Sequence, residues 1–183
     1  AINPSANVTL FWGANDGGTA PANWANTVEL GTISLTSSKL SSGIIVTSDL
    51  PPTYQPSTRP VSLLVDGVLP ASDGSYSTWN VWYRQDPTFT FDLGEEHTLE
   101  EISIFFQPWD RGDELAEVKV EVSRDGVNFV DFNAYAGFVA TRGKGAWAEM
   151  DLRTVKARFF RLTPKFQGWG HLWGEVEFWE IKR

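Results

Sequence analysis

Apolar and polar residues alternate with a period of two along the middle of the chain. Phe89, Phe91 and Leu93 alternate with polar neighbours, and residues 118–122 repeat the pattern with valine at every second position. A period of two places alternate side chains on one face of an extended chain, so both stretches are predicted as half-buried β-strands. Residues 99–107 form an apolar run between them, which we predict as a third strand.

Strand signals also occur on both sides of this segment, whereas no stretch has a convincing helical period. The sequence Asp125-Gly126 is typical of a tight hairpin turn. We predict one all-β domain over residues 1–183, a jelly-roll-like β-sandwich of two antiparallel sheets. Residues 46–183 would form its body and residues 1–45 would add strands; alternatively, the first 35 residues are the tail of a preceding domain.

Several short motifs occur in an order that resembles a known family. They resemble the discoidin-like domains of coagulation factors and the family 32 carbohydrate-binding modules, which have a galactose-binding-domain-like fold. The resemblance extends over about residues 61–181. The motifs are Leu-Val-Asp-Gly at 64–67 followed by Trp79, Phe-Asp-Leu-Gly at 91–94, the alternating valines and Asp-Gly turn at 118–126, Ala-Arg-Phe-Phe-Arg-Leu at 157–162, and Glu-Val-Glu-Phe-Trp at 175–179.

The charge and the cysteine count narrow the classes of partner. A formal net charge of −8 disfavours nucleic acid, because binding to phosphates needs a basic surface. It also disfavours an anionic membrane or a sulfated polymer, unless Arg142, Lys144 and Lys165 form a local patch. No apolar run approaches the roughly 18 residues of a membrane-spanning helix. The chain has no cysteine, whereas animal discoidin domains commonly contain a disulfide, so we expect a bacterial relative.

The nine tryptophans are the most informative feature of the composition. Tryptophan is rarely fully buried, because its large ring carries an N–H group that needs a partner. A core of this size would accommodate about half of them. The remaining indole rings are expected at the surface, where flat aromatic faces stack on sugar rings.

The sequence contains no convincing catalytic constellation. Neither His97 nor His171 lies in the setting of a catalytic triad, and two histidines without cysteine make a poor zinc or thiol site. The paired glutamates at 95–96 and 100–101 are typical of charged turns, not of a glycosidase carboxylate pair. We therefore predict that the chain is not an enzyme.

The resemblance implies a sugar-binding site on the loops at one end of the sandwich, built from an aromatic ring and polar groups that bind hydroxyls. The loop at residues 108–113 matches a family loop that carries an arginine, but here Trp109 follows the proline and Arg111 comes later, which disfavours galactose specificity. Alternatively, Trp109 packs over its loop and Arg111 pairs with Asp110 or Asp113. The expected ligand-binding residues are, in order of preference, Trp109 and Arg111, then Trp169, His171 and Trp173, then Arg142 and Asp110.

The resemblance also implies a structural calcium ion in the loop before Trp79. Calcium binds six to eight oxygen ligands in flexible geometry. Alternatively, both aspartates of this loop only cap turns. The expected ligands are Asp66 or Asp73, the hydroxyl of Ser77 or Thr78, backbone carbonyls, and Glu175 from the last strand.

These expectations favour a non-catalytic carbohydrate-binding module that binds a polysaccharide or oligosaccharide. It would be a monomeric part of a secreted or cell-surface bacterial enzyme, linked in cis to a catalytic domain that degrades polysaccharide. Two other classes stay open: a protein-interaction or adhesion domain, and a structural spacer whose surplus tryptophans pack against a neighbouring domain.

Overall fold

The computed structural model describes residues 5–12, 28–53, 59–71, 76–110 and 114–182. The chain forms two compact units, one comprising Ala1–Ser38 and Ile181–Arg183 and the other comprising Lys39–Glu180. We call the second unit the body, because it contains the motifs on which the family resemblance depends.

The first unit contains an antiparallel pair of strands. Strand β1 (Ser5–Trp12) pairs with β2 (Val28–Lys39) in a register that joins Ser5 to Thr36 and Trp12 to Val28. The strands predicted near residues 8–12 and 28–35 are therefore present. Whether they extend the sandwich of the body or form a separate element stays a prediction.

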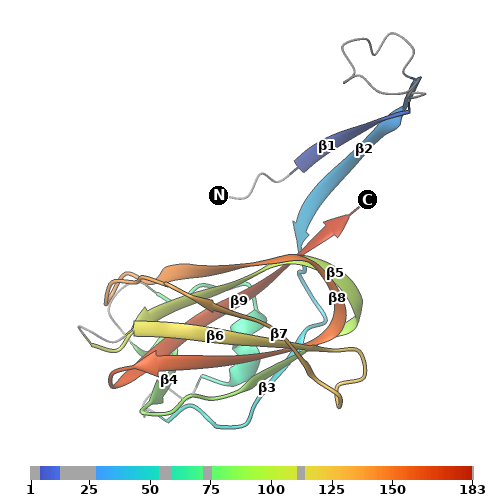
Figure 1. Cartoon of the computed structure of the whole chain (residues 1–183). Coiled ribbons are helices and arrows are strands. Elements are labelled where there is room, and N and C mark those ends of the chain that lie inside the picture. The colour runs from blue at the N-terminus through green and yellow to red at the C-terminus, as the bar shows by residue number, and fades with distance from the viewer. Residues whose placement is uncertain (1–4, 13–27, 54–58, 72–75, 111–113, 183) are drawn as a thin grey trace. The chain divides into compact units, whose positions relative to one another are not determined.

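The body is built from β-strands that pair only in the antiparallel sense, with short 3-10 helices between the early ones. None of the helices in the described residues is long and apolar enough to cross a membrane. The strands, labelled in Figure 1, are β3 (Ile45–Ser48), β4 (Asn80–Tyr83), β5 (Phe89–Pro108), β6 (Glu114–Ser123), β7 (Val130–Ala136), β8 (Ala146–Gln167) and β9 (Gly170–Lys182). The short 3-10 helices are η2 (Val61–Val65) and η3 (Tyr76–Thr78).

The two layers of the sandwich share the long strands β5 and β8, whose ribbons curve from one layer into the other (Figure 1). The start of β5 pairs with β3 and with the end of β8, which also pairs with β6. The rest of β5 pairs with β9 and with the start of β8. The predicted two-layer sandwich is thus confirmed, and its layers are joined by continuous strands.

The bend in β5 lies where the sequence predicted a charged turn. The β5–β8 register shifts between Asp92 and His97, and Gly94 in this segment has a φ of 84°. A second register shift lies between Leu99 and Glu101, opposite Arg153 and Thr154 of β8, which have positive φ values of 48° and 66°. The stretches predicted as separate strands at 88–93 and 99–107 are therefore one bent strand.

The core between the layers is rich in aromatic rings. Phe178 of β9 contacts Phe91 of β5 and Phe160 of β8, with ring centroids 5.1 Å and 5.9 Å away. All three side chains are fully buried. Because β9 belongs to one layer while Phe91 and Phe160 belong to the other, Phe178 connects the two layers.

We expect the substitution Phe178→Ala to lower the free energy of unfolding by about 3–5 kcal/mol, the usual cost of a large cavity in a packed core. Urea denaturation measures the change. The matched control is Val139→Ala, since Val139 is 85% exposed. The control should cost less than about 0.5 kcal/mol. A loss at Phe178 no larger than the control would contradict its role between the layers.

Candidate functional site

Three aromatic side chains from separate segments meet at one end of the body. Tyr83 ends β4, Trp109 follows β5, and Trp169 lies in the turn between β8 and β9. The Tyr83 ring centroid lies 6.0 Å from that of Trp109 and 5.9 Å from that of Trp169. We call these three residues the aromatic cluster.

Backbone hydrogen bonds fix the three segments of the aromatic cluster against one another. The amide of Arg84 donates to the carbonyl of Trp169 at 2.8 Å, and the amide of Trp109 donates to the carbonyl of Gly170 at 3.3 Å. Strand β4 also pairs with the start of β9, with Tyr83 opposite Gly170. The rings are therefore carried by strand ends whose positions are set by main-chain pairing, as a preformed binding surface requires.

Two backbone features mark this end of the body as specialised. A side chain at Gly170 would place its Cβ 2.5 Å from the carbonyl oxygen of Trp82, so only glycine allows β9 to lie this close to β4. Arg84 has a φ of 53°, a left-handed conformation that costs a non-glycine residue about 1–2 kcal/mol. Such strained residues concentrate at functional sites, which supports this end as the site.

The aromatic cluster combines exposed faces with a cation. Trp169 is 48% exposed and Tyr83 is 39% exposed. The guanidinium carbon of Arg84 lies 4.0 Å from the Trp169 ring centroid and 5.5 Å from that of Tyr83. A cation over an aromatic face is attracted by the ring quadrupole, so Arg84 helps to hold both rings in place while its N–H groups extend the polar surface.

Trp109 packs on the body and also lies beside Tyr83, and its predicted role in ligand binding stays a prediction. It is half-buried and packs against a small apolar cluster formed by Trp79, Val81 and Leu172. Its ring also meets Tyr83 edge to face. Trp109 therefore anchors its loop on the body and forms one border of the aromatic cluster.

An ion pair lies next to Trp109 in sequence. The Arg142 guanidinium donates to the carboxylate of Asp110 at 3.1 Å, and both side chains are about half exposed. The structure thus brings together two of the predicted polar site residues. Arg111 and Asp113 lie outside the described residues, so their predicted roles stay predictions.

The predicted roles of His171 and Trp173 as surface ligand contacts are wrong, because both side chains are fully buried. His171 stacks on Phe166 at a centroid distance of 3.5 Å, and its Nε2 lies 3.0 Å from the carbonyl of Gln85. Trp173 stacks on Phe89 in the core at 4.4 Å. The sequence predicted a loop over residues 166–173 and a last strand from Gly174, but β9 begins at Gly170, so both residues lie within a strand instead of a loop.

Tyr83 and Arg84 lie at the candidate site although neither was among the expected ligand-binding residues; the sequence suggested only that Arg84 and one aromatic residue before it border the binding loops. A signal was present, since an aromatic residue and an arginine follow the buried Trp82 directly. What was missing is the pairing of β4 with β9, which places Tyr83 beside Trp169 across the sheet.

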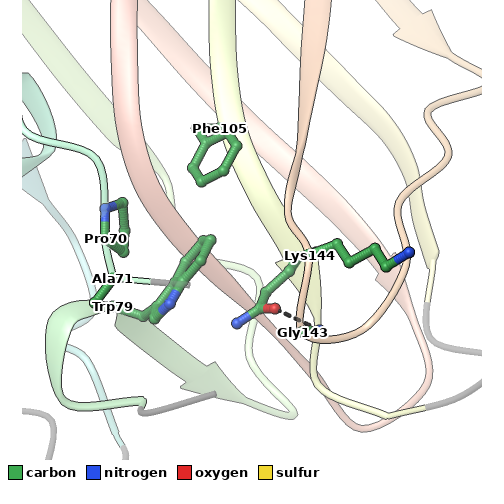
Figure 2. Close-up of a pocket in the computed structure, with 7 residues that line it drawn as sticks. Pro70, Ala71, Trp79, Phe105, Gly143 and Lys144 are labelled. Atoms are coloured by element: carbon green, nitrogen blue, oxygen red, sulfur yellow. Dashed lines mark hydrogen bonds between the residues drawn. The ribbon is translucent and has the colours of Figure 1, made fainter. Parts of the chain in front are cut away.

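A small cavity lies behind the site, between Trp79 and Phe105 on one side and Gly143 and Lys144 on the other (Figure 2). Its volume of about 20 Å³ holds one water molecule but no sugar ring. The side-chain oxygen of Gln107 accepts a hydrogen bond from the amide of Gly143 at 2.8 Å beside it. The cavity therefore supports the loops and is not itself the ligand site.

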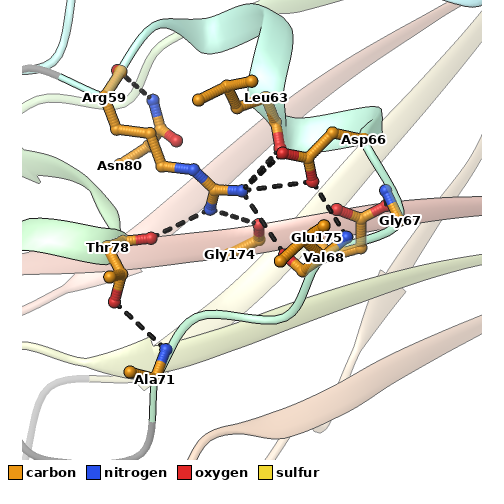
Figure 3. A network of polar contacts seen from close by, with 10 residues as sticks. All are labelled: Arg59, Leu63, Asp66, Gly67, Val68, Ala71, Thr78, Asn80, Gly174 and Glu175. Atoms are coloured by element: carbon orange, nitrogen blue, oxygen red, sulfur yellow. Dashed lines mark hydrogen bonds and ion pairs between the residues drawn. The ribbon is translucent and has the colours of Figure 1, made fainter.

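Of the residues expected to bind calcium, Asp66 and Thr78 contact the side chain of Arg59 (Figure 3). One of its terminal nitrogens donates to the carbonyls of Thr78 and Gly174 at 2.9 and 2.8 Å. The other lies 3.3 Å from the carboxylate of Asp66. Asp73 lies outside the described residues, and Ser77 is exposed.

Glu175, the remaining expected calcium ligand, is nearly fully buried. One carboxylate oxygen accepts from the amide of Gly67 at 3.0 Å, whereas the other has no hydrogen-bond partner. Burial raises the pKa of Glu175 to about 8, with the nearby Asp66 carboxylate adding to the rise. Burial therefore favours the neutral, protonated form of Glu175.

The fit of calcium to this loop is poor. No group of three or more His, Cys, Asp or Glu side chains in the described ranges could hold a metal ion. Calcium would need to approach the oxygens within 2.3–2.6 Å. The guanidinium of Arg59 already lies among those oxygens. The calcium site inferred from the sequence stays a prediction, and the position of Arg59 speaks against it.

Comparisons with known proteins place the body in a common fold. The profile of the F5/8 type C domain matches residues 44–178. A Clostridium perfringens domain in complex with GalNAc-β-1,3-galactose is similar with a TM-score of 0.58, at 15% identity over 77% of this chain and 99% of that one. The family 32 module of C. perfringens NanJ in complex with galactose is similar with a TM-score of 0.56, at 12% identity over 79% of this chain and 99% of that one. A fucose-binding module of Streptococcus pneumoniae is similar with a TM-score of 0.54, at 16% identity over 77% of this chain and 96% of that one. The comparison with curated proteins found no match to the chain.

The buried His171 predicts a pH dependence of stability. Burial lowers the pKa of His171 from 6.5 to about 3, so the folded chain keeps this ring neutral while the unfolded chain protonates it below about pH 6.5. Between these values the unfolded state binds more protons, so the free energy of unfolding falls as the pH falls. The slope approaches about 1.4 kcal/mol per pH unit for one proton.

The substitution His171→Phe isolates this contribution. Urea unfolding of both proteins from pH 7 to about pH 4 should show a shallower loss of stability in the variant, whatever its absolute stability. Asp86, which accepts a hydrogen bond from the amide of Phe166 beside His171, titrates in both proteins and cancels in the difference. Identical slopes for the two proteins would show that His171 is not held neutral by burial.

Proposed function

Since the chain belongs to the F5/8 type C domain family, we propose that it is a non-catalytic carbohydrate-binding module whose ligand contacts the aromatic cluster. The observation that carries this proposal is the meeting of Tyr83, Trp109 and Trp169, two of them well exposed, beside the cation of Arg84. Aromatic rings next to fixed polar groups suit a sugar, which has apolar C–H faces and hydroxyl edges.

In the proposed binding mode, the aromatic rings stack on the sugar and the polar groups bind its hydroxyls. Trp169 and Tyr83 offer the exposed aromatic surface on which a sugar ring stacks. Arg84 supplies N–H donors at the edge of this surface, and the Asp110–Arg142 pair supplies a carboxylate and a second guanidinium. Charged groups bind hydroxyl pairs well, because charge-assisted hydrogen bonds are shorter and stronger than neutral ones.

The proposed setting is a secreted or cell-surface bacterial enzyme that degrades polysaccharide, with its catalytic domain linked in cis. A module that contacts one or two sugar units binds weakly, but it raises the effective concentration of the linked domain on an insoluble substrate. The similar domains from C. perfringens and S. pneumoniae, whose descriptions name galactose, GalNAc-β-1,3-galactose and fucose, support a glycan as the ligand. The module is proposed to act as a monomer.

A binding panel tests this proposal. The chain is screened against soluble and insoluble polysaccharides by affinity electrophoresis and pull-down, and each hit is measured by calorimetry. We expect at least one glycan to bind and Trp169→Ala to weaken it by about tenfold or more, because a stacked ring contributes roughly 0.5–1.5 kcal/mol beyond its buried area. Tyr83→Ala should weaken the same glycan.

The matched control is Trp179→Ala, which removes a partly exposed tryptophan near the opposite end of β9. Its affinity should equal that of the unaltered chain, and near-ultraviolet circular dichroism confirms the fold of each variant. A folded chain that binds no glycan in the panel would reject the proposal and favour the spacer or the adhesion domain. If Trp179→Ala weakens glycan binding as much as Trp169→Ala does, the glycan does not bind at the aromatic cluster.

A further inference from the structure

The guanidinium of Arg59 lies at the centre of a group of oxygen atoms from separate segments of the body (Figure 3). The Arg59 side chain is only 9% exposed. Its terminal nitrogens contact the carbonyl of Leu63 in η2 at 2.8 Å and that of Val68 in the following loop at 3.4 Å. The same nitrogens contact the carbonyls of Thr78 at the end of η3 and of Gly174 in β9 at 2.9 and 2.8 Å.

The ligands of Arg59 are of the kind that bind a hard cation. They comprise four backbone carbonyls and the carboxylate of Asp66, which lies 3.3 Å and 3.4 Å from the nearer nitrogen through its two oxygens. Carbonyl and carboxylate oxygens are the usual ligands of calcium in proteins. Here the four carbonyls and the carboxylate instead accept hydrogen bonds from the planar array of N–H donors that only arginine provides.

One group of oxygens does not accommodate both cations. Calcium would bind at 2.3–2.6 Å from its ligand oxygens, within the region that the guanidinium occupies. A calcium ion and the guanidinium of Arg59 bound to the same oxygens in this largely buried place would repel each other strongly. Arg59 thus serves as the cation of this loop, since it pairs with the Asp66 carboxylate and donates to the inward carbonyls, whereas one buried carboxylate oxygen of Glu175 lacks a partner in the described structure.

We propose that Arg59 is a built-in cation that takes the place of a structural calcium ion, so that the body folds and keeps its loops in position without metal. The carbonyl of Arg59 also accepts a hydrogen bond from the Asn80 side chain at 2.8 Å. Asn80 begins β4, and Tyr83 ends it. The main chain at Arg59 is thus linked to the strand that carries part of the aromatic cluster.

The first test measures the thermal unfolding midpoint of the unaltered full chain in EDTA and in calcium chloride at about 10 mM, roughly ten times the weakest Kd typical of extracellular calcium sites. We expect the two midpoints to agree within about 1 °C. Calcium bound only to the folded chain would raise the midpoint by about 3 °C or more under these conditions, and such a rise would overturn the proposal. The measurement requires no glycan, so it is independent of the proposed function.

The second test replaces the arginine. Arg59→Ala removes the charged partner of Asp66, which keeps the amide of Val68 as a donor, and it removes the arginine's donors to the inward carbonyls. We expect it to lower the unfolding midpoint by about 6–15 °C. Arg59→Lys keeps the charge but loses the planar donor array, so it should also lower the midpoint, by less than Arg59→Ala.

The matched control for the arginine variants is Arg124→Ala. The Arg124 side chain is 77% exposed and pairs only at the surface with Glu96 in the described structure. Its loss should move the midpoint by less than about 2 °C. If Arg59→Ala and Arg124→Ala have the same unfolding midpoint, Arg59 is not the built-in cation of the loop. Should Arg59→Ala fail to fold, the calcium comparison on the unaltered chain still decides the proposal.

Discussion

The antiparallel pairing of β5 with β8 is the interaction on which the rest of the body depends, because it runs through both layers. Its first part joins Phe89–Asp92 to the end of β8, and its second part joins residues 97–106 to the start of β8. Main-chain hydrogen bonds at both ends of the bend fix how the layers meet. The aromatic core around Phe178 then fills the space that this bend encloses.

The pairing of β5 and of β4 with β9 determines where the aromatic cluster forms. Strand β5 ends at Pro108, opposite His171 of β9, so Trp109 emerges beside the turn that carries Trp169. Strand β4 lies on the other side of β9 and brings Tyr83 to the same place. Three loops with no common sequence signal thus deliver rings to one surface, because their strands are neighbours in the sheet. The buried His171 and Trp173 support this surface from below instead of forming it.

The loop before β4 shows how a buried group of oxygens is stabilised by side-chain chemistry. Carbonyls that point inward from η2, η3 and β9 need donors, because an unpaired buried polar group is costly. Arg59 satisfies them from a single side chain and also balances the charge of Asp66. Glu175 lies outside this set of contacts and binds the amide of Gly67. The loop that orients β4 is therefore held by one guanidinium.

The sequence by itself determined the all-β fold and the family, because a period of two and local turn motifs are properties of neighbouring residues, as at residues 118–126. It also selected Trp109 and Trp169, which the structure brings together beside Tyr83, since their loops carry aromatic residues between glycine, proline and charged positions. It did not separate these from His171 and Trp173, because burial depends on where β9 begins and on what packs against it. Only the tertiary structure decided that Tyr83 and Arg84 join the cluster and that Arg59 reaches oxygens as far along the chain as Gly174, because those contacts join segments that no local pattern connects.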